Sequence, residues 1–245
     1  MRRLFSIRRK RPPSLPAGVR VYAVGDVHGR ADLLKGVFAR IDMDLAAYPV
    51  VRPLEVYLGD YVDRGPDSFN VLEWLIARAQ LRETICLKGN HEALLLEFLV
   101  HPALLTSWRQ WGALETLLSY GLNPPLNPAE AEQEELAHLL AQSMPSPHRR
   151  FLESLKLGFR CGGFLFVHAG VRPGVPLDEQ IEADLLWIRE DFLFSEEDFG
   201  KIVVHGHTPV SEPDIRRNRI NIDTGAYATG RLTCLAIEGS DVRVV

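Results

Sequence analysis

Cysteine is scarce in this 245-residue chain, and long apolar runs are absent. The three cysteines, Cys86, Cys161 and Cys234, are far apart, and each lies in an apolar, strand-like segment. We therefore expect reduced thiols buried in the core of a cytoplasmic protein, not a disulfide framework. No apolar run approaches the roughly 20 residues that a membrane-spanning helix needs, so we expect no membrane span.

Charge is distributed unevenly along the chain. The formal net charge is −4, but residues 1–11 carry six basic side chains and no acidic one. Subtracting these six leaves 22 basic against 32 acidic residues, or −10 for the rest. A body this acidic does not suit nucleic-acid binding. We expect residues 1–18, which are basic and then proline-rich, to form a disordered, solvated tail; weak contact with acidic lipid or a partner is the alternative.

Apolar strand-like segments alternate with helical patterns in the first part of the chain. We expect strands at 19–24, 54–58 and 84–88, with helices at about 31–48 and 67–80 between them. This order, with fully apolar strands, predicts an α/β sheet covered on both faces. Five further strands are expected at 163–167, 201–204, 219–222, 231–237 and 241–245. We interpret residues 19–245 as one domain, with a leucine-rich helical insertion at about 91–157.

Six apolar segments end in an Asp, Asn or His next to glycine. These residues are Asp26 and His28, Asp60, Asn90 and His91, His168, His207, and Asp223. In open α/β sheets, ligands bind outside the carboxyl ends of the strands, so these distant side chains are expected to meet at one rim. The turn at 59–65 adds Asp63 and Arg64 on a loop with glycine at both ends, which suits close approach to a ligand.

Carboxylate, amide and imidazole groups without a thiolate suit manganese, iron or catalytic zinc better than structural zinc. A pair of ions needs a shared carboxylate, and Asp60 is the candidate. Two ions about 3.5–4 Å apart activate a water and hold the attacking and leaving oxygens of a phosphoryl displacement. A single histidine at such a place would more simply be a core residue, but six segments together favour a two-metal site.

Five motifs carry a resemblance to a known family. They are Asp26-x-His28-Gly29, Gly59-Asp60-x-Val62-Asp63-Arg64-Gly65, Gly89-Asn90-His91-Glu92, His168-Ala169-Gly170 and Gly206-His207. In this order the chain resembles the PPP-type Ser/Thr protein phosphatases, most closely their compact bacterial and phage members, which are similar to the wider calcineurin-like metallophosphoesterases. The resemblance spans about residues 19–230. It implies an α/β sandwich of two mixed β-sheets flanked by helices.

The resemblance also implies two divalent metal ions, commonly Mn²⁺, with iron or zinc as alternatives. Asp26, His28 and Asp60 match ligands of the first ion. Asp60, Asn90, His168 and His207 match ligands of the second. His91 matches the general acid and Asp63 the carboxylate that orients it. Arg64 and, on a weaker motif, Arg189 match phosphate clamps; for Arg189 the alternative is a solvated charge at a helix end.

On this resemblance we expect a metal-dependent phosphoprotein phosphatase that acts on a phosphoprotein or phosphopeptide. A hydroxide bridging the metals attacks phosphorus, and His91 protonates the leaving oxygen of phosphoserine or phosphothreonine. The alternative is a hydrolase of diadenosine polyphosphates, which shares the metal set. Such enzymes typically lack an acid at the position of Asp63 and carry Asp at that of Glu92, which favours the phosphatase. A catalytically dead scaffold is a third hypothesis, disfavoured because no ligand or catalytic position is missing.

Rival phosphate chemistries do not fit the sequence. None of the three cysteines is followed six residues later by arginine, as a cysteine phosphatase requires. The only Asp-x-Asp pair, Asp42 and Asp44, falls within a helical pattern, whereas an aspartyl-phosphate phosphatase needs it after a strand. A glycine-rich P-loop is also missing.

Five residues keep two interpretations or a minor role. Trp108 and Trp111 of the insertion either shape access to the site or belong to the core. Asp223 either lies behind the metals or only forms a turn. Glu92 is expected to favour the start of a helix through the helix dipole. His205 is expected to belong to a strand and not to be a further ligand.

Overall fold

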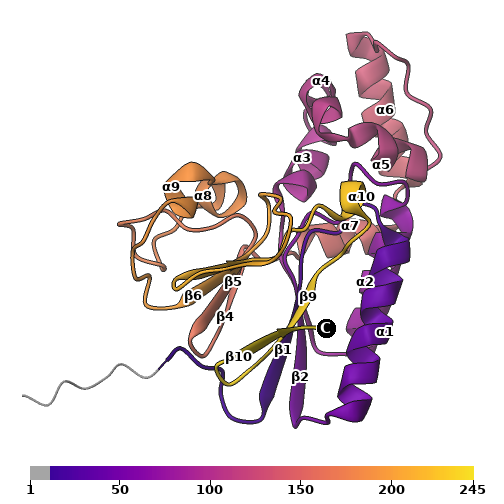
Figure 1. Ribbon diagram of the computed structural model, residues 1–245. Helices are drawn as coiled ribbons and strands as arrows, with labels where there is room; N and C mark the ends of the chain where they lie inside the picture. The colour runs from indigo at the N-terminus through magenta and orange to yellow at the C-terminus, as the bar shows by residue number, and fades with distance from the viewer. Residues whose placement is uncertain (1–11) are drawn as a thin grey trace, which may run out of the picture.

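Two five-stranded mixed sheets pack face to face, and helices cover both outer faces (Figure 1). The computed structural model describes residues 12–245, so the first eleven residues of the expected tail lie outside the described range. This architecture confirms the sandwich implied by the family resemblance.

The first sheet has the order β10-β9-β1-β2-β3. Its strands are β1 (Val19–Val24), β2 (Arg52–Tyr57), β3 (Thr84–Cys86), β9 (Cys234–Glu238) and β10 (Asp241–Val244). The first three strands run parallel and are joined by helices α1 (Ala31–Ala47) and α2 (Ser68–Leu81), whereas β9 runs antiparallel to β1. The expected β-α-β-α-β unit is therefore present, and its parallel strands all point their carboxyl ends to one edge.

The second sheet has the order β4-β5-β6-β8-β7. Its strands are β4 (Gly158–Cys161), β5 (Phe164–Val167), β6 (Ile202–His205), β7 (Asp214–Ile215) and β8 (Arg219–Asn221). Strands β4 and β7 were not expected, because β4 is half exposed and β7 has only two residues. Two short helices, α8 (Glu182–Trp187) and α9 (Glu190–Leu193), cover the outer face of this sheet (Figure 1).

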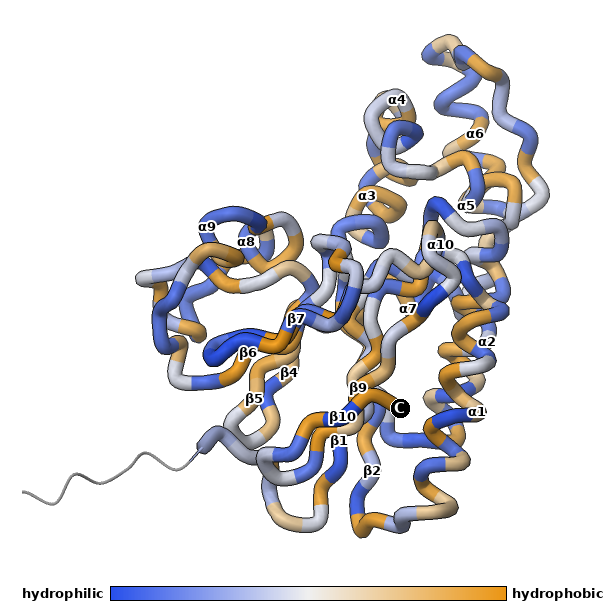
Figure 2. Tube along the Cα trace, in the orientation of Figure 1, coloured by the Kyte–Doolittle hydropathy of each residue, from blue (hydrophilic) through white to orange (hydrophobic). Residues whose placement is uncertain are grey.

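The core between the sheets explains why the strands are apolar on both faces. On β1, Val21 and Ala23 pack toward the second sheet, while Tyr22 and Val24 pack toward the helices. Figure 2 shows the hydrophobic residues concentrated along the strands. A strand that is half exposed alternates apolar and polar residues, whereas a strand buried on both faces is apolar throughout. The sequence of these strands has the second pattern.

The segment interpreted from the sequence as an insertion, about residues 91–157, is mostly helical. It contains α3 (Asn90–Phe98), α4 (Leu105–Trp108), α5 (Ala113–Ser119), α6 (Glu130–Ser143) and α7 (Ser146–Glu153), with short 3-10 turns at Pro102–Leu104 and Arg109–Trp111. Helices α3 to α6 extend beyond the carboxyl ends of the first sheet (Figure 1). Leu95, Trp108 and Leu117 belong to the same hydrophobic cluster as Leu34 and Val71, so the insertion shares the core of the first sheet.

Residues 12–18 do not form part of a disordered tail, so this part of the prediction is wrong. Leu15 is only 4% exposed, and its N–H donates a hydrogen bond to Gly239 O (2.8 Å). Ser14 O accepts a hydrogen bond from Gly163 N–H (2.8 Å). Gly239 follows β9 and Gly163 precedes β5, so the segment links the two sheets at one end of the sandwich.

Two further expectations concern cysteine and the membrane. The three cysteines are free; Cys234 is buried, whereas Cys86 and Cys161 are half-buried. Within residues 12–245 no helix has the length and apolar character to cross a membrane.

Replacing Leu15 by alanine is expected to destabilise the fold by about 2–5 kcal/mol, because it removes a side chain from the core between the sheets. The measurement is the free energy of unfolding in urea. The control is Leu126→Ala, whose side chain is 82% exposed, and for which we expect a change below about 0.5 kcal/mol. Equal stabilities for the two variants would show that residues 12–18 do not hold the sheets together.

Candidate active site

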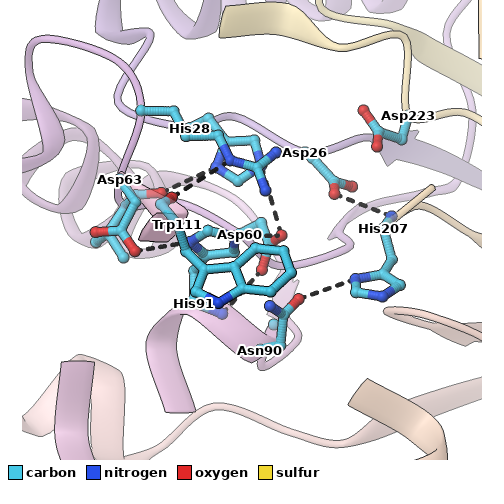
Figure 3. Close-up of polar contacts among 12 residues, drawn as sticks. Asp26, His28, Asp60, Asp63, Asn90, His91, Trp111, His207 and Asp223 are labelled. Atoms are coloured by element: carbon cyan, nitrogen blue, oxygen red, sulfur yellow. Dashed lines mark hydrogen bonds and ion pairs between the residues drawn. The ribbon is translucent and has the colours of Figure 1, made fainter. Parts of the chain in front are cut away.

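The residues singled out from the sequence converge at the carboxyl ends of the strands of both sheets (Figure 3). Asp26 and His28 follow β1, Asp60 follows β2, Asn90 and His91 begin α3 after β3, His168 follows β5, and His207 follows β6. All of these side chains are buried. Distant segments of the chain thus supply one site, as the position of these residues after strands predicts.

The loops that carry these residues have unusual backbone angles. Among residues 12–245, five non-glycine residues have positive φ, between 47° and 71°: His28, Asp60, Asp63, Arg64 and His207. Side chains other than glycine rarely adopt this region, and such strain is common at functional sites. At these five residues, the placement of the side chain in the folded protein therefore outweighs the backbone preference of the residue type.

Glu92 holds the loop that carries Asp60. Its buried carboxylate accepts hydrogen bonds from the backbone N–H groups of Asp60 (2.9 Å), Tyr61 (2.7 Å) and Gly89 (2.9 Å). Burial and the nearby charge of Asp60 raise the pKa of Glu92 to about 7. We expected only an effect on the helix start. Its bond to Gly89, three residues earlier, is half of a capping box, a signal present in the sequence.

Asp60 lies at the centre of the site. Its Oδ1 is 3.3 Å from His168 Nε2, and its Oδ2 is 3.5 Å from His28 Nε2. Two groups of donor atoms, each within 4.8 Å of one another, could hold a metal ion: one contains His28, Asp60 and His91, the other Asp60, His168 and His207. Asp60 is the residue that the two groups share, as expected of a bridging carboxylate.

Two further expected ligands complete this arrangement. Asn90 Oδ1 is 2.9 Å from both His168 Nε2 and His207 Nδ1. Asp26 Oδ2 accepts the backbone N–H of His207 (3.0 Å), which leaves Oδ1 for another partner. A side chain on Gly206 would collide with that Oδ1, so the glycine is needed for the close approach.

Burial lowers the pKa of three histidines of the site, His28, His168 and His207, and so favours their neutral form. His28 Nδ1 donates to Val62 O (3.0 Å) and His168 Nδ1 donates to Leu58 O (2.9 Å). Since a carbonyl only accepts, both rings carry a proton on Nδ1. The Nε2 of His28 faces Asp60, and that of His168 faces the oxygens of both Asp60 and Asn90. Burial lowers the pKa of His28 to about 3 and that of His207 to about 2. Neutral imidazole is the form that binds metals.

Buried negative charge in the site needs a cation. Burial, followed by the charges of Asp223 and Asp60, raises the pKa of Asp26 well above its usual value. Asp26 Oδ1, His91 Nε2 and His207 Nε2 are buried and lack a hydrogen-bond partner within the described part of the chain. Unpaired buried polar atoms are costly, and a bound cation relieves that cost. The residues present therefore fit a pair of divalent metal ions.

His91 is paired with Asp63, which the insertion holds in place. His91 Nδ1 lies 2.7 Å from Asp63 Oδ2. The fully buried Asp63 also accepts from Trp108 Nε1–H (2.6 Å) and from the Thr116 hydroxyl (2.6 Å). Burial alone would lower the pKa of His91, but Asp60 and Asp63 outweigh burial and raise it.

The two tryptophans of the insertion have different roles. Trp108 is a core residue that also donates to Asp63, whereas Trp111 is partly exposed and lies edge-on to His91, with ring centres 6.4 Å apart. Of the two, Trp111 is thus the one that lies at the edge of the site. Thr116, in α5, was not anticipated, because a threonine within a helical pattern carries no signal of its partner.

The two expected phosphate clamps lie on different sides of the site. Arg64 Nη1 is 3.3 Å from His28 Nε2, and its guanidinium lies 4.8 Å from the ring centre of Tyr227, a residue that we did not anticipate. Arg189 is half-buried at the start of α9. After burial and His168, its charge contributes to the lowered pKa of His207, which places it on that side. This position differs from that of a fully solvated charge.

Asp223 and His205 resolve as follows. Asp223 Oδ1 accepts the N–H of Gly225 (2.9 Å), so it forms the turn, and its charge also acts on Asp26. The turn is therefore confirmed, whereas a place for Asp223 behind the metals stays a prediction. His205 ends β6, and its ring packs 4.9 Å from that of Phe192 in the cluster on the outer face of the second sheet, which agrees with a strand residue.

Comparison with protein families identifies the chain. The model of the calcineurin-like phosphoesterase family matches residues 19–237. This protein belongs to the calcineurin-like metallophosphoesterases. Members of this family use two divalent metal ions, in agreement with the two overlapping donor groups around Asp60.

Relatives of this metallophosphoesterase carry names that point to nucleotide substrates. The asymmetrical bis(5'-nucleosyl)-tetraphosphatase PrpE of Anoxybacillus flavithermus is 26% identical to it, over 86% of this chain and 88% of that protein. A crystal structure attributed to a diadenosine tetraphosphatase superposes with a TM-score of 0.62 at 23% identity, covering 94% of this chain and 98% of that one.

A Ser/Thr phosphatase from Saccharomyces cerevisiae has the same fold, with a TM-score of 0.55 at 15% identity, covering 89% of this chain and 72% of that one. At this identity the likeness shows the fold alone. The comparisons thus show the family to which the chain belongs. The named relatives do not support the closer likeness to Ser/Thr phosphatases that we inferred from the motifs.

Replacing Thr116 by valine is expected to destabilise the metallophosphoesterase by about 1–3 kcal/mol, because the buried Asp63 carboxylate loses a hydroxyl donor. The free energy of unfolding measures this effect. Thr116→Ser is the matched control, since it keeps the hydroxyl, and it should lie closer to wild type. If valine and serine were equally tolerated, the Thr116–Asp63 hydrogen bond would contribute nothing to stability.

Proposed function

We propose that this metallophosphoesterase hydrolyses dinucleoside tetraphosphates, the alternative hypothesis from the sequence. The observation that supports this most is the named PrpE relative, whose likeness extends over 86% of this chain. It replaces the Ser/Thr phosphatase as our leading hypothesis. The argument from Asp63 and Glu92 favoured the phosphatase on two positions only, and the likeness over most of the chain outweighs it.

In this proposal the metal ligands are those expected from the sequence. Asp26, His28 and Asp60 hold one ion, and Asp60, Asn90, His168 and His207 hold the other. Oxygen and imidazole donors suit Mn²⁺, with iron or zinc as alternatives. When bound, the two ions supply an activated water and stabilise the charge that develops on the phosphate oxygens.

The remaining side chains bind the phosphate chain and manage the proton. Arg64 and Arg189 approach from the His28 side and the His207 side, where two planar guanidinium groups can bind the phosphate oxygens. His91 directs its unpartnered Nε2 into the site while Asp63 holds Nδ1. This geometry suits donation of a proton to the leaving oxygen.

A second candidate is a Ser/Thr phosphoprotein phosphatase, with a phosphoprotein or phosphopeptide as substrate. The observation that favours it is the buried Asp63, which receives two donors and orients His91. A serine or threonine alkoxide is a poor leaving group and needs a well-placed acid to protonate it. The nucleotide released when a phosphoanhydride is cleaved is a better leaving group and depends less on such an acid. The His91–Asp63 pair is therefore expected to contribute more to the hydrolysis of a phosphate ester than to that of an anhydride.

The experiment that tests the proposed function compares kcat/KM for diadenosine tetraphosphate and a phosphoserine peptide at the same Mn²⁺ concentration. We expect at least a tenfold preference for the nucleotide, and products of AMP and ATP, as the word asymmetrical in the relative's name implies. Asp60→Asn, purified in parallel, controls for contaminating phosphatase. A preference for the peptide would replace the proposal by the second candidate.

The metal assignment predicts a different pattern for each carboxylate. Calorimetric titration with Mn²⁺ should find two sites in the wild type. Asp60→Asn should weaken both by at least about tenfold, since loss even of a residue that only supports a ligand costs about 10–100-fold. Asp26→Asn should weaken mainly one. Asp32→Asn, an exposed change at the start of α1, is the control. Two unchanged sites in Asp60→Asn would refute the shared carboxylate.

A further inference from the structure

A cavity of about 540 Å³ lies beside the candidate active site. Arg64 of the central turn, residues of the insertion between 109 and 115, and Tyr227 of α10 (Ala226–Thr229) line it. Its volume falls within the roughly 300–1,000 Å³ of small-molecule sites. None of the six expected metal ligands lines the cavity, so it is a separate space next to the metal centre.

Two aromatic rings border both the cavity and the site. Trp111 is 36% exposed and Tyr227 is 39% exposed. The Trp111 ring centre lies 6.4 Å from that of His91, and the Tyr227 ring centre lies 5.4 Å from that of His28. Figure 3 shows the Trp111 indole next to His91. Partly exposed rings in such a place offer faces on which a planar base can stack.

Arg64 connects the cavity to the site. One end of its guanidinium reaches to 3.3 Å from His28 Nε2, and the group lies 4.8 Å from the Tyr227 ring centre. A phosphate held by Arg64 therefore has the cavity as its neighbouring space. The group attached to that phosphate would enter between residues 109–115 and Tyr227.

Gly112 fixes the cavity wall relative to Arg64. The backbone N–H of Arg64 donates to Gly112 O (3.1 Å), and a Cβ at Gly112 would lie 2.6 Å from Arg64 N. Gly112 also has a φ of +99°, which other residues rarely adopt. The turn that carries Trp111 is thus bonded directly to the loop that carries Arg64, and the two form one wall.

Two polar side chains of the cavity are free to bond to a nucleoside. Within residues 12–245, the side chains of Gln110 and Glu115 make no hydrogen bond to another protein group. An amide and a carboxylate can bond to the edge of a base or to ribose hydroxyls. Arg64 and Arg109 also line the cavity, so its lining carries charges of both signs.

We propose that this cavity binds the nucleoside next to the cleaved phosphate, with the base stacked on the rings of Trp111 and Tyr227. This inference rests on the proposed function, because it presumes a nucleotide substrate. It adds a specificity site made by the insertion, outside the metal centre.

The test is calorimetric titration of the Mn²⁺-loaded full-length protein with AMP and with ribose 5-phosphate, which lacks the base. We expect AMP to bind about tenfold more tightly or better, the contribution of a stacked base. In Trp111→Ala and in Tyr227→Ala the ratio of the two dissociation constants should fall toward one, and Trp111→Phe should retain part of it. Tyr48→Ala is the control, since Tyr48 is 63% exposed at the end of α1 away from the site.

The outcomes separate this inference from the proposed function. Equal affinities in the wild type, or a ratio unchanged in both alanine variants, would overturn the nucleoside site, even if diadenosine tetraphosphate is cleaved. A ratio that depends on Trp111 and Tyr227 would support the nucleoside site. If the wild type then failed to cleave diadenosine tetraphosphate, the proposed function would fail while the nucleoside site remained.

Discussion

The buried carboxylate of Asp60 is the constraint on which the rest of the site depends. It faces His28 on one side and His168 on the other, and it belongs to both groups of donor atoms. Within residues 12–245 this carboxylate has no ion pair with lysine or arginine; it faces imidazoles, and burial disfavours the charged form of His28 and His168. Divalent cations are the natural partners of such a group. The fold can therefore be understood as a scaffold that holds one carboxylate where two ions can share it.

Holding that carboxylate requires an unfavourable local backbone, which the surrounding fold supports. Asp60 and four neighbouring functional residues have left-handed backbone angles, and Glu92 receives the N–H groups of the Asp60 loop. The strands that end at these loops are buried on both faces, between the second sheet and the helices. Rigid, fully packed strands thus stabilise loops that would not adopt these angles alone. The packed sheets stabilise the fold, and the candidate active site lies at the carboxyl ends of their strands.

The insertion contacts the expected general acid, His91, and the loop of the expected phosphate clamp, Arg64, and it carries Trp111 at the edge of the site. Trp108 and Thr116 hold Asp63, which holds His91, while Gly112 is bonded to the loop of Arg64. Trp111, between these residues in the chain, stands at the edge of the site. The expected metal ligands lie after strands or at the start of α3, whereas Trp111, Gly112 and Thr116 belong to the later part of the insertion.

The sequence by itself determined the local features of this protein. Asp26, Asp60 and His168 follow apolar strands, so their meeting at one rim could be predicted, and the motifs indicated the family before the fold was seen. Only the tertiary structure decided which side chains support them. Nothing local marks Thr116 or Tyr227 as neighbours of the site, because their partners lie 53 residues away in one case and on another element in the other. Leu15 likewise reads as part of a polar, proline-rich tail, and only the packing of the two sheets provides the apolar core that buries it. The short-range pattern of residues specifies where the strands lie and end. The long-range packing of the chain decides which side chains contact the residues at those ends.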